Sequence, residues 1–309
     1  MKHPLVIGSR GSKLALWQAE HVQSQLKAID PTLDVRIDVI KTTGDVKTDP
    51  LTVIGGKGVF TKELEDALLD GRVDMAVHSL KDLPTILPDQ LMIAAICQRE
   101  DPRDALILRE PFALDSLADL PDGAVVGTSS QRRIAQLKSI CPRVVVKDLR
   151  GNVDTRLRKL DEGQYDSLIL ASAGLRRLGL QDRINFSIPA VEMLPAVGQG
   201  AIAIETHVQN ELAIQAAAQL QHEQTRIACL AERALLRSLG GGCQLPIAGH
   251  AIVEGQLIRI EGLVASPDGA RIVRDMISGP AESAAQLGAA LGQKLRDDGA
   301  DSILQESLS

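Results

Sequence analysis

Aromatic residues are scarce in this 309-residue chain, which has one tryptophan, one tyrosine and three phenylalanines. Proteins that bind nucleic acids normally combine stacking rings with a basic surface. The formal net charge of this chain is −6. A nucleic-acid partner is therefore not expected, and any local cluster of arginines would serve a small anionic ligand.

Closely spaced pairs of histidines or cysteines, as found in zinc sites, are also missing. The six histidines include no HxxxH pair, and no CxxC pair occurs among the four cysteines, Cys97, Cys141, Cys229 and Cys243. Zinc sites usually contain such pairs. No metal is therefore expected.

Long apolar runs are absent, and a membrane span would need about 20 such residues. The N-terminus passes from residues 1–4 directly into the strand-like residues 5–7, without a signal or transit segment. We therefore expect a cytoplasmic protein with no membrane partner.

Strand-like runs alternate with helical patterns up to about residue 200, which is typical of an α/β fold with mainly parallel sheets. Residues 5–12 resemble residues 125–130, because each stretch passes from a strand through a Gly/Ser/Thr turn into a helix. Residues 57–77 also resemble residues 150–170, because each stretch passes from a helix through a glycine-containing turn into a strand. The sequence therefore predicts two similarly built α/β domains that face one another, as in hinged ligand-binding proteins.

The pattern changes after about residue 221. Residues 224–239 predict one amphipathic helix, and residues 281–297 predict another. Strand-like segments separated by Gly-containing hairpin signals lie between them, at residues 251–253, 257–260 and 272–273. This part of the chain is expected to form a small α+β domain with an antiparallel sheet.

Cys243 lies in the glycine-rich segment 240–246, directly after the first of these helices. Three glycines give the backbone the freedom to carry a small side chain out of a helix end. Two interpretations stay open from the residues alone. Cys243 is either an accessible thiolate nucleophile or an inert buried side chain, which is the commoner fate of a lone cysteine.

Polar and basic residues gather where the predicted strands end. In open α/β sheets, ligands bind beyond the carboxyl ends of the strands, near helix N-termini. A single arginine there is usually a solvated surface charge, but a whole set predicts a ligand with many carboxylates. The set comprises Arg10, Ser12, His78, Ser79, Lys81, Asp82, Ser130, Arg132, Arg133, Arg150, Arg156 and Arg177.

Asp82 is the acidic member of this set. A carboxylate at such a position often only caps a turn or a helix. Within a basic cleft, however, it would stay ionised and could stabilise a cationic intermediate or move a proton. Asp82 is therefore the candidate catalytic residue.

Eight segments, in order along the chain, resemble motifs of the porphobilinogen deaminases, also called hydroxymethylbilane synthases. They are residues 14–19 (LALWQA), 55–58 (GGKG), 78–84 (HSLKDLP), 99–105 (REDPRDA), 127–130 (GTSS), 150–153 (RGNV), 194–200 (LPAVGQG) and 241–244 (GGCQ). The resemblance extends over the whole length of the chain, and chance occurrence of all these motifs together is negligible.

The resemblance implies three domains, the first two of the periplasmic-binding-protein type. We expect them at residues 1–98 with 199–220, at 103–194 and at 221–309. It also implies a dipyrromethane cofactor that is joined to Cys243 by a thioether. Such an enzyme condenses four porphobilinogens head to tail, releases four ammonia molecules and supplies hydroxymethylbilane to porphyrin and haem biosynthesis.

The resemblance also implies a role for each motif residue. Asp82 would hydrogen-bond pyrrole N–H groups and stabilise the positive charge that develops as ammonia leaves. The cofactor would be bound by Lys81, Asp82, Thr128, Ser130, Arg132, Arg133 and Arg150. The substrate would be bound by Arg10, Ser12, Arg150, Arg156, Arg177 and Gln199. Lys57 and Phe60 would lie on a mobile loop over the cleft.

Three positions depart from the usual motifs: Lys13 stands where proline is common, Val59 where leucine is usual, and Gln131 where leucine is frequent. Of these three departures, only the one in the loop near Val59 could affect turnover. The family suggests a monomer. The alternative is a hinged two-domain protein that binds a small polyanion without catalysis, which predicts no covalent adduct and normally a secretion signal.

Overall fold

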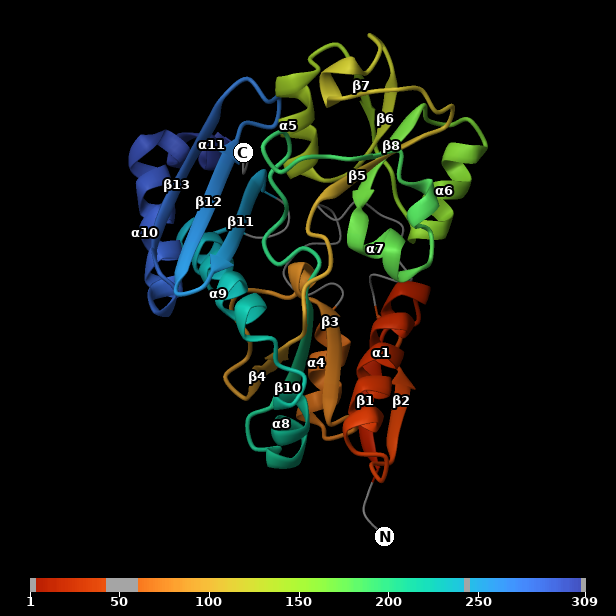
Figure 1. Cartoon of the computed structure of the whole chain (residues 1–309), viewed down its shortest axis with the longest axis vertical. Coiled ribbons are helices and arrows are strands. Elements are labelled where there is room, and N and C mark those ends of the chain that lie inside the picture. The colour runs from red at the N-terminus through yellow and green to blue at the C-terminus, as the bar shows by residue number, and fades with distance from the viewer. Residues whose placement is uncertain (1–3, 43–60, 242–244, 307–309) are drawn as a thin grey trace. The chain divides into compact units, whose positions relative to one another are not determined.

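The computed structural model describes residues 4–42, 61–241 and 245–306. The chain divides into two compact units (Figure 1). The first unit contains residues 1–100 and 201–226, and the second contains residues 101–200 and 227–309. The second unit holds two separate sheets. The division into three domains stays a prediction.

The first unit is built on a five-stranded sheet with the order β2-β1-β3-β10-β4. β1 is parallel to β2 and β3, whereas β10 is antiparallel to β3 and β4. Every strand except β10 therefore runs in one direction. The bounds are β1 Leu5–Ser9, β2 Val35–Val39, β3 Met75–Ser79, β4 Leu91–Ile96 and β10 Ile202–His207.

Helices cover both faces of this sheet. They are α1 (Lys13–Ile29), α4 (Lys62–Leu69) and α8 (Glu211–Ala218). Strand β3 alternates between the two faces, because Met75 and Val77 pack with side chains of α1 and α8, whereas Ala76 packs with side chains of α4. Residues on β3 at even positions therefore point toward α4.

The second unit contains a sheet of the same design, with the order β7-β6-β8-β5-β9. β6 is parallel to β7 and β8, and β5 is antiparallel to β8 and β9. Order and directions match those of the first sheet, so the predicted similarity of the two α/β parts is confirmed. The bounds are β5 Asp104–Leu108, β6 Val125–Gly127, β7 Val145–Lys147, β8 Ser167–Ala171 and β9 Phe186–Ser187.

The helices of this sheet are short. They are α5 (Gln131–Ile140), α6 (Val153–Asp161) and α7 (Ser172–Arg177). Gly127 is the last residue of β6, and its lack of a side chain lets Leu168 and Tyr165 pack directly against the backbone just before α5. A Cβ atom there would lie 2.5 Å from Leu168 Cδ2 and 2.8 Å from Tyr165 Cδ1, so a side chain would force both residues away.

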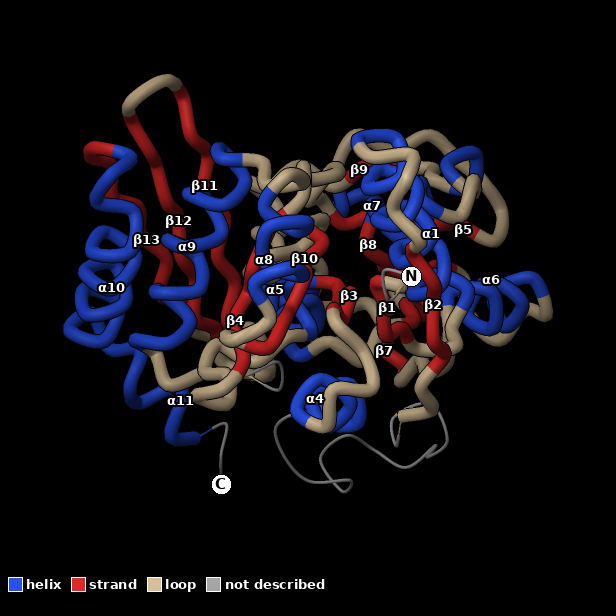
Figure 2. Tube along the Cα trace, turned by 90° about the horizontal axis from the view of Figure 1, so that it is seen from below, coloured by secondary structure: helices blue, strands red, loops and turns tan. Residues whose placement is uncertain are grey.

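The C-terminal sheet is antiparallel with the order β11-β12-β13, as predicted. Helix α10 runs beside β13 (Figure 2), and side chains of α9 and α10 share one apolar core with the sheet. The expected helix at residues 281–297 is shorter. The bounds are α9 Glu223–Ser238, β11 Ile247–Glu254, β12 Leu257–Ala265, β13 Ile272–Pro280, α10 Ala284–Leu295 and α11 Asp301–Glu306.

Candidate active site

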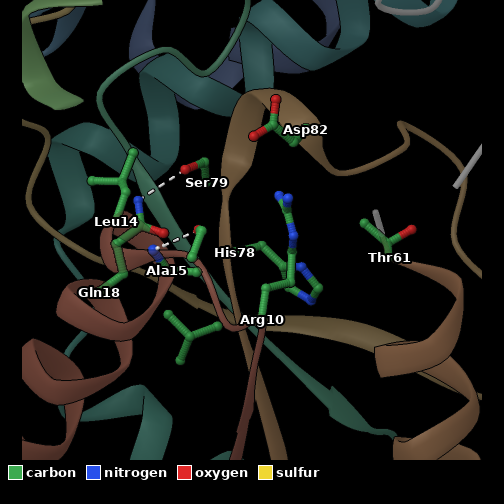
Figure 3. Close-up of a pocket in the computed structure, with 10 residues that line it drawn as sticks. Arg10, Leu14, Ala15, Gln18, Thr61, His78, Ser79 and Asp82 are labelled. Atoms are coloured by element: carbon green, nitrogen blue, oxygen red, sulfur yellow. Dashed lines mark hydrogen bonds between the residues drawn. The ribbon is translucent and has the colours of Figure 1, made fainter. Parts of the chain in front are cut away.

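A pocket in the first unit lies where β1 and β3 end (Figure 3). Because these two strands are parallel neighbours, their carboxyl ends meet at one edge of the sheet. The pocket brings together five members of the predicted polar set, which are Arg10, Ser12, His78, Ser79 and Asp82. Its lining residues are Arg10, Ser12, Leu14, Ala15, Gln18, Thr61, Val77, His78, Ser79 and Asp82.

The N-terminus of α1 forms one side of the pocket. Ser12 is the N-cap, and its Oγ accepts a hydrogen bond of 3.3 Å from the backbone N–H of Ala15. Gln18 on the same helix donates from Nε2 to Ser79 Oγ at 2.8 Å, which ties α1 to the end of β3. The first turn of α1 contains no acidic residue. The positive end of the dipole of this helix therefore favours an anion.

Asp82 and Arg10 place opposite charges at the pocket. Asp82 ends the short 3-10 turn Leu80–Asp82 and is exposed. The guanidinium of Arg10 extends from the end of β1 toward Asp82 (Figure 3). The backbone N–H of Leu80 donates to Ala201 O at 3.0 Å, which fixes the start of the turn. Lys81 precedes Asp82 and is half-buried.

His78 and Glu205 form a buried pair that the sequence did not reveal. His78 lines the pocket, and its Nε2 lies 3.0 Å from Glu205 Oε2. The two side chains are 4% and 0% exposed. The available signal was an acidic residue directly after the apolar residues 201–204. A buried carboxylate requires a polar partner, but a partner 127 positions away cannot be identified from spacing.

In the second unit, Arg132 and Arg133 at the start of α5 converge on Asp104 of β5. Arg132 Nη1 donates to Asp104 Oδ2 at 2.7 Å, and Arg133 Nη2 donates to Asp104 Oδ1 at 2.7 Å. Gln199 Nε2 donates to the same Oδ1 at 2.9 Å. All four side chains are buried. Burial alone would raise the pKa of Asp104, but the charges of Arg132 and Arg133 outweigh this effect and hold the pKa well below its usual range.

A buried donor of this cluster has no partner in the part of the chain that the structure describes. Arg132 Nε is buried and makes no hydrogen bond to any residue within the described ranges. A buried donor of this kind normally has an acceptor. Arg132 is the second residue of α5. The N-cap of this helix is Ser130, whose side chain makes no capping bond, and the Ser130 N–H donates to Thr128 Oγ1 at 3.3 Å. This end of β6 therefore offers donors to an anionic ligand.

The remaining predicted arginines lie at other strand and helix ends of the second unit. Arg150 is half-buried, with Nε 3.4 Å from Asp148 Oδ2. Arg156 Nε donates to Gly151 O at 2.7 Å, within the turn that begins α6. Arg177 is buried and donates from Nη2 to Gly200 O at 2.6 Å.

Lys57, Phe60 and Cys243 lie outside the described residues. Among residues 4–42, 61–241 and 245–306, no group of three or more His, Cys, Asp or Glu side chains could hold a metal ion. No helix in the same part of the chain is long and apolar enough to cross a membrane. The cysteines that are described, Cys97, Cys141 and Cys229, are buried, and burial raises the pKa of the Cys141 thiol to about 11.

Two family models match the chain. The model described as "Porphobilinogen deaminase, dipyromethane cofactor binding domain" matches residues 5–215, and "Porphobilinogen deaminase, C-terminal domain" matches residues 226–297. The chain belongs to the porphobilinogen deaminase family. The family predicted from the sequence motifs is confirmed, and so is dipyrromethane as its cofactor.

Relatives match over nearly the full length. Porphobilinogen deaminase of Chromobacterium violaceum is 50% identical over 306 residues, which cover 99% of this chain and 98% of that protein. The enzyme of Synechococcus elongatus is 49% identical and covers 98% of this chain and 95% of its own length. A solved structure of substrate binding domain 2 of Lactococcus lactis GlnP has a TM-score of 0.45 and 14% identity, covering 77% of this chain and 91% of that one.

Proposed function

We propose that this protein is a transferase that condenses four porphobilinogens head to tail, with loss of four ammonia molecules, to give hydroxymethylbilane. The observation that supports this most strongly is the match to porphobilinogen deaminases, which covers nearly the full length of the chain with about half of the residues identical. The pocket geometry agrees with it, because Arg10, Ser12 and the N-terminus of α1 offer donors to the carboxylates of a pyrrole substrate.

Asp82 is the catalytic residue in this proposal. Loss of ammonia from the aminomethyl group leaves a positive charge that is shared with the pyrrole nitrogen. A fixed carboxylate at the pocket stabilises this charge and accepts a hydrogen bond from the pyrrole N–H. Arg10 extends toward Asp82 (Figure 3) and would hold a substrate carboxylate beside it.

The donors of the second unit fit a polycarboxylate such as dipyrromethane. The unpartnered Nε of Arg132 and the open N-cap of α5 support this fit most directly. The bound group supplies a primer on which the pyrrole chain is built. Residues that would hold it are Lys81, Asp82, Thr128, Ser130, Arg132, Arg133 and Arg150, and Cys243 would form the thioether bond.

The carboxylates of the substrate would be bound by Arg10, Ser12, Arg150, Arg156, Arg177 and Gln199. In the structure Arg177 and Gln199 bond to backbone carbonyls at residues 200 and 102, respectively. Their part in substrate binding therefore includes holding the segment at residues 198–200 in place. We further propose that the protein acts as a cytoplasmic monomer.

The decisive experiment is incubation of the purified protein with porphobilinogen, with ammonia and hydroxymethylbilane measured together. The proposal expects four ammonia molecules for each bilane released. Binding of porphobilinogen without ammonia release would support the alternative, a non-catalytic hinged binder for a small polyanion. The family matches do not favour that alternative.

A further inference from the structure

The floor of the pocket in the first unit contains a histidine that is held from behind by a buried acid. His78 and Glu205 lie on neighbouring antiparallel strands, where His78 is opposite Ala203 and Glu205 is opposite Ala76. They are therefore diagonal neighbours on one face of the sheet, and side chains in this relationship reach each other. The contact follows from the register of β3 and β10.

The contact determines which ring nitrogen is open. Nε2 lies 3.0 Å from Glu205 Oε2, so with an ionised Glu205 the proton of the neutral imidazole resides on Nε2. Nδ1 is then the basic nitrogen. Within the described ranges Nδ1 has no hydrogen-bond partner, although the residue is only 5% exposed and lines the pocket. A buried base with an open lone pair faces a ligand site.

Four ionisable groups lie behind this ring or in the same pocket. Glu205 contacts it from β10, Glu65 lies near it on α4, and Arg10 and Asp82 share the pocket with it. Glu205 Oε1 and Glu65 Oε1 are buried without a hydrogen-bond partner in the described part of the chain. Burial raises the pKa of Glu65, and the charge of Glu205 adds to this effect. Glu65 therefore keeps its proton more readily than an exposed glutamate does.

We propose that His78 is the proton acceptor of this pocket and that Glu205 is the positioning residue that keeps its Nδ1 open to the substrate. This inference rests on the proposed function. His78 would accept the proton that is released during condensation. Asp82 is poorly suited to accept it, because the ionised form of Asp82 is needed beside the cationic substrate.

Each addition breaks one C–N bond, forms one C–C bond and releases one proton. The C–N bond of the incoming aminomethyl group breaks, and its electron pair leaves with ammonia. A C–C bond forms between the methylene carbon and the free α-carbon of the substrate ring added before. That α-carbon loses its proton to His78 Nδ1, and the imidazolium then gives the proton to the ammonia, which departs as ammonium. His78 is neutral again for the next addition.

The kinetic test compares His78→Gln with His207→Gln, a matched control on β10 whose ring lies outside the pocket lining. His78→Gln should lower kcat about a hundredfold, leave KM unchanged and remove the low-pH limb of the pH–rate profile. His207→Gln should keep wild-type kcat. A His78→Gln enzyme with the wild-type profile would overturn the proposal, as would a uniform loss of rate at every pH, because that is the result of a purely structural role.

Glu205→Gln provides a second variant that keeps an acceptor oxygen for the Nε2 proton. Without the carboxylate charge the imidazolium is less favoured, so the low-pH limb should move to lower pH. An unmoved limb would contradict the positioning role. If the wild-type protein itself releases no ammonia from porphobilinogen, the proposed function fails. The protonation of the His78 ring is then tested by a measurement that needs no turnover.

That measurement is the ¹⁵N spectrum of histidine-labelled protein, with the His78 signals assigned by their loss in His78→Gln. The neutral ring should carry its proton on Nε2 and leave Nδ1 unprotonated. A proton on Nδ1 of the neutral ring would overturn the inference independently of activity.

Discussion

Arg132 Nη1 lies 2.7 Å from Asp104 Oδ2, and these side chains are only 4% and 0% exposed. Arg133 bonds to the other oxygen of the same carboxylate. The two arginines are thus first of all internal partners of one buried acid, while Arg132 Nε is buried without a partner among the described residues.

Asp104→Asn should destabilise the protein strongly, because two buried guanidinium groups lose their counter-charge. The expected loss is about 3–5 kcal/mol in the free energy of unfolding, measured by urea titration. Asp122→Asn is the matched control, since it breaks an exposed pair with Arg143 and should cost no more than about 1 kcal/mol. Equal losses in the two variants would show that the buried cluster is not structural.

Arg150→Leu should yield a folded protein that lacks the cofactor. Arg150 is half-buried, and its contact to Asp148 is long at 3.4 Å, so the fold depends little on it. A carboxylate of the cofactor would lose its charge-assisted partner. The intact mass of the purified variant should equal that of the bare chain, whereas the exposed Arg143→Leu should retain the adduct. An adduct on Arg150→Leu would exclude this role.

Asp82→Asn should separate binding from chemistry. Asparagine keeps the size and one acceptor oxygen but removes the charge that stabilises the substrate cation, so single-turnover addition of porphobilinogen should slow by about 10²–10³-fold. The thermal unfolding midpoint should change little because Asp82 is exposed. Addition at the wild-type rate would mean that the carboxylate only shapes the turn.

Glu65→Gln should change how stability depends on pH. Burial raises the pKa of Glu65 above its ordinary value of 4.5, so the wild-type protein loses stability as pH rises from about that value through the raised pKa. Glutamine has no proton to lose. The free energy of unfolding of the variant relative to wild type should therefore be higher at about pH 8 than at about pH 4. A difference that is the same at both values would contradict the burial argument.

Much of the fold could be predicted from local patterns. The strand–turn–helix repeats at residues 5–12 and 125–130 correspond to β1–α1 and β6–α5, and the hairpin signals at Gly255 and Gly269 fall at glycines with φ of 62° and 74°. Such signals arise within a few residues. The helix expected to reach residue 297 leaves regular α-helix after Leu295, and Gly299 with φ of 105° lies in the kink that follows.

The site could be predicted in part. Arg10, Ser12 and Asp82 come together as expected, because each follows a strand of one parallel group. The partners of the buried charges could not be predicted. Asp104 precedes Arg132 by 28 positions, and His78 precedes Glu205 by 127. Such pairs depend on strand register and on burial, which the sequence of either residue alone does not contain.

The intact mass of the purified protein, recorded before and after brief exposure to porphobilinogen, tests the central claim most directly. The account predicts the mass of the bare chain plus two pyrrole units, then a ladder of further substrate units that each lack one ammonia. Cys243→Ser should show neither the adduct nor the ladder, whereas replacement of the buried Cys141 by alanine should retain both. A bare-chain mass that stays unchanged in substrate would contradict the account.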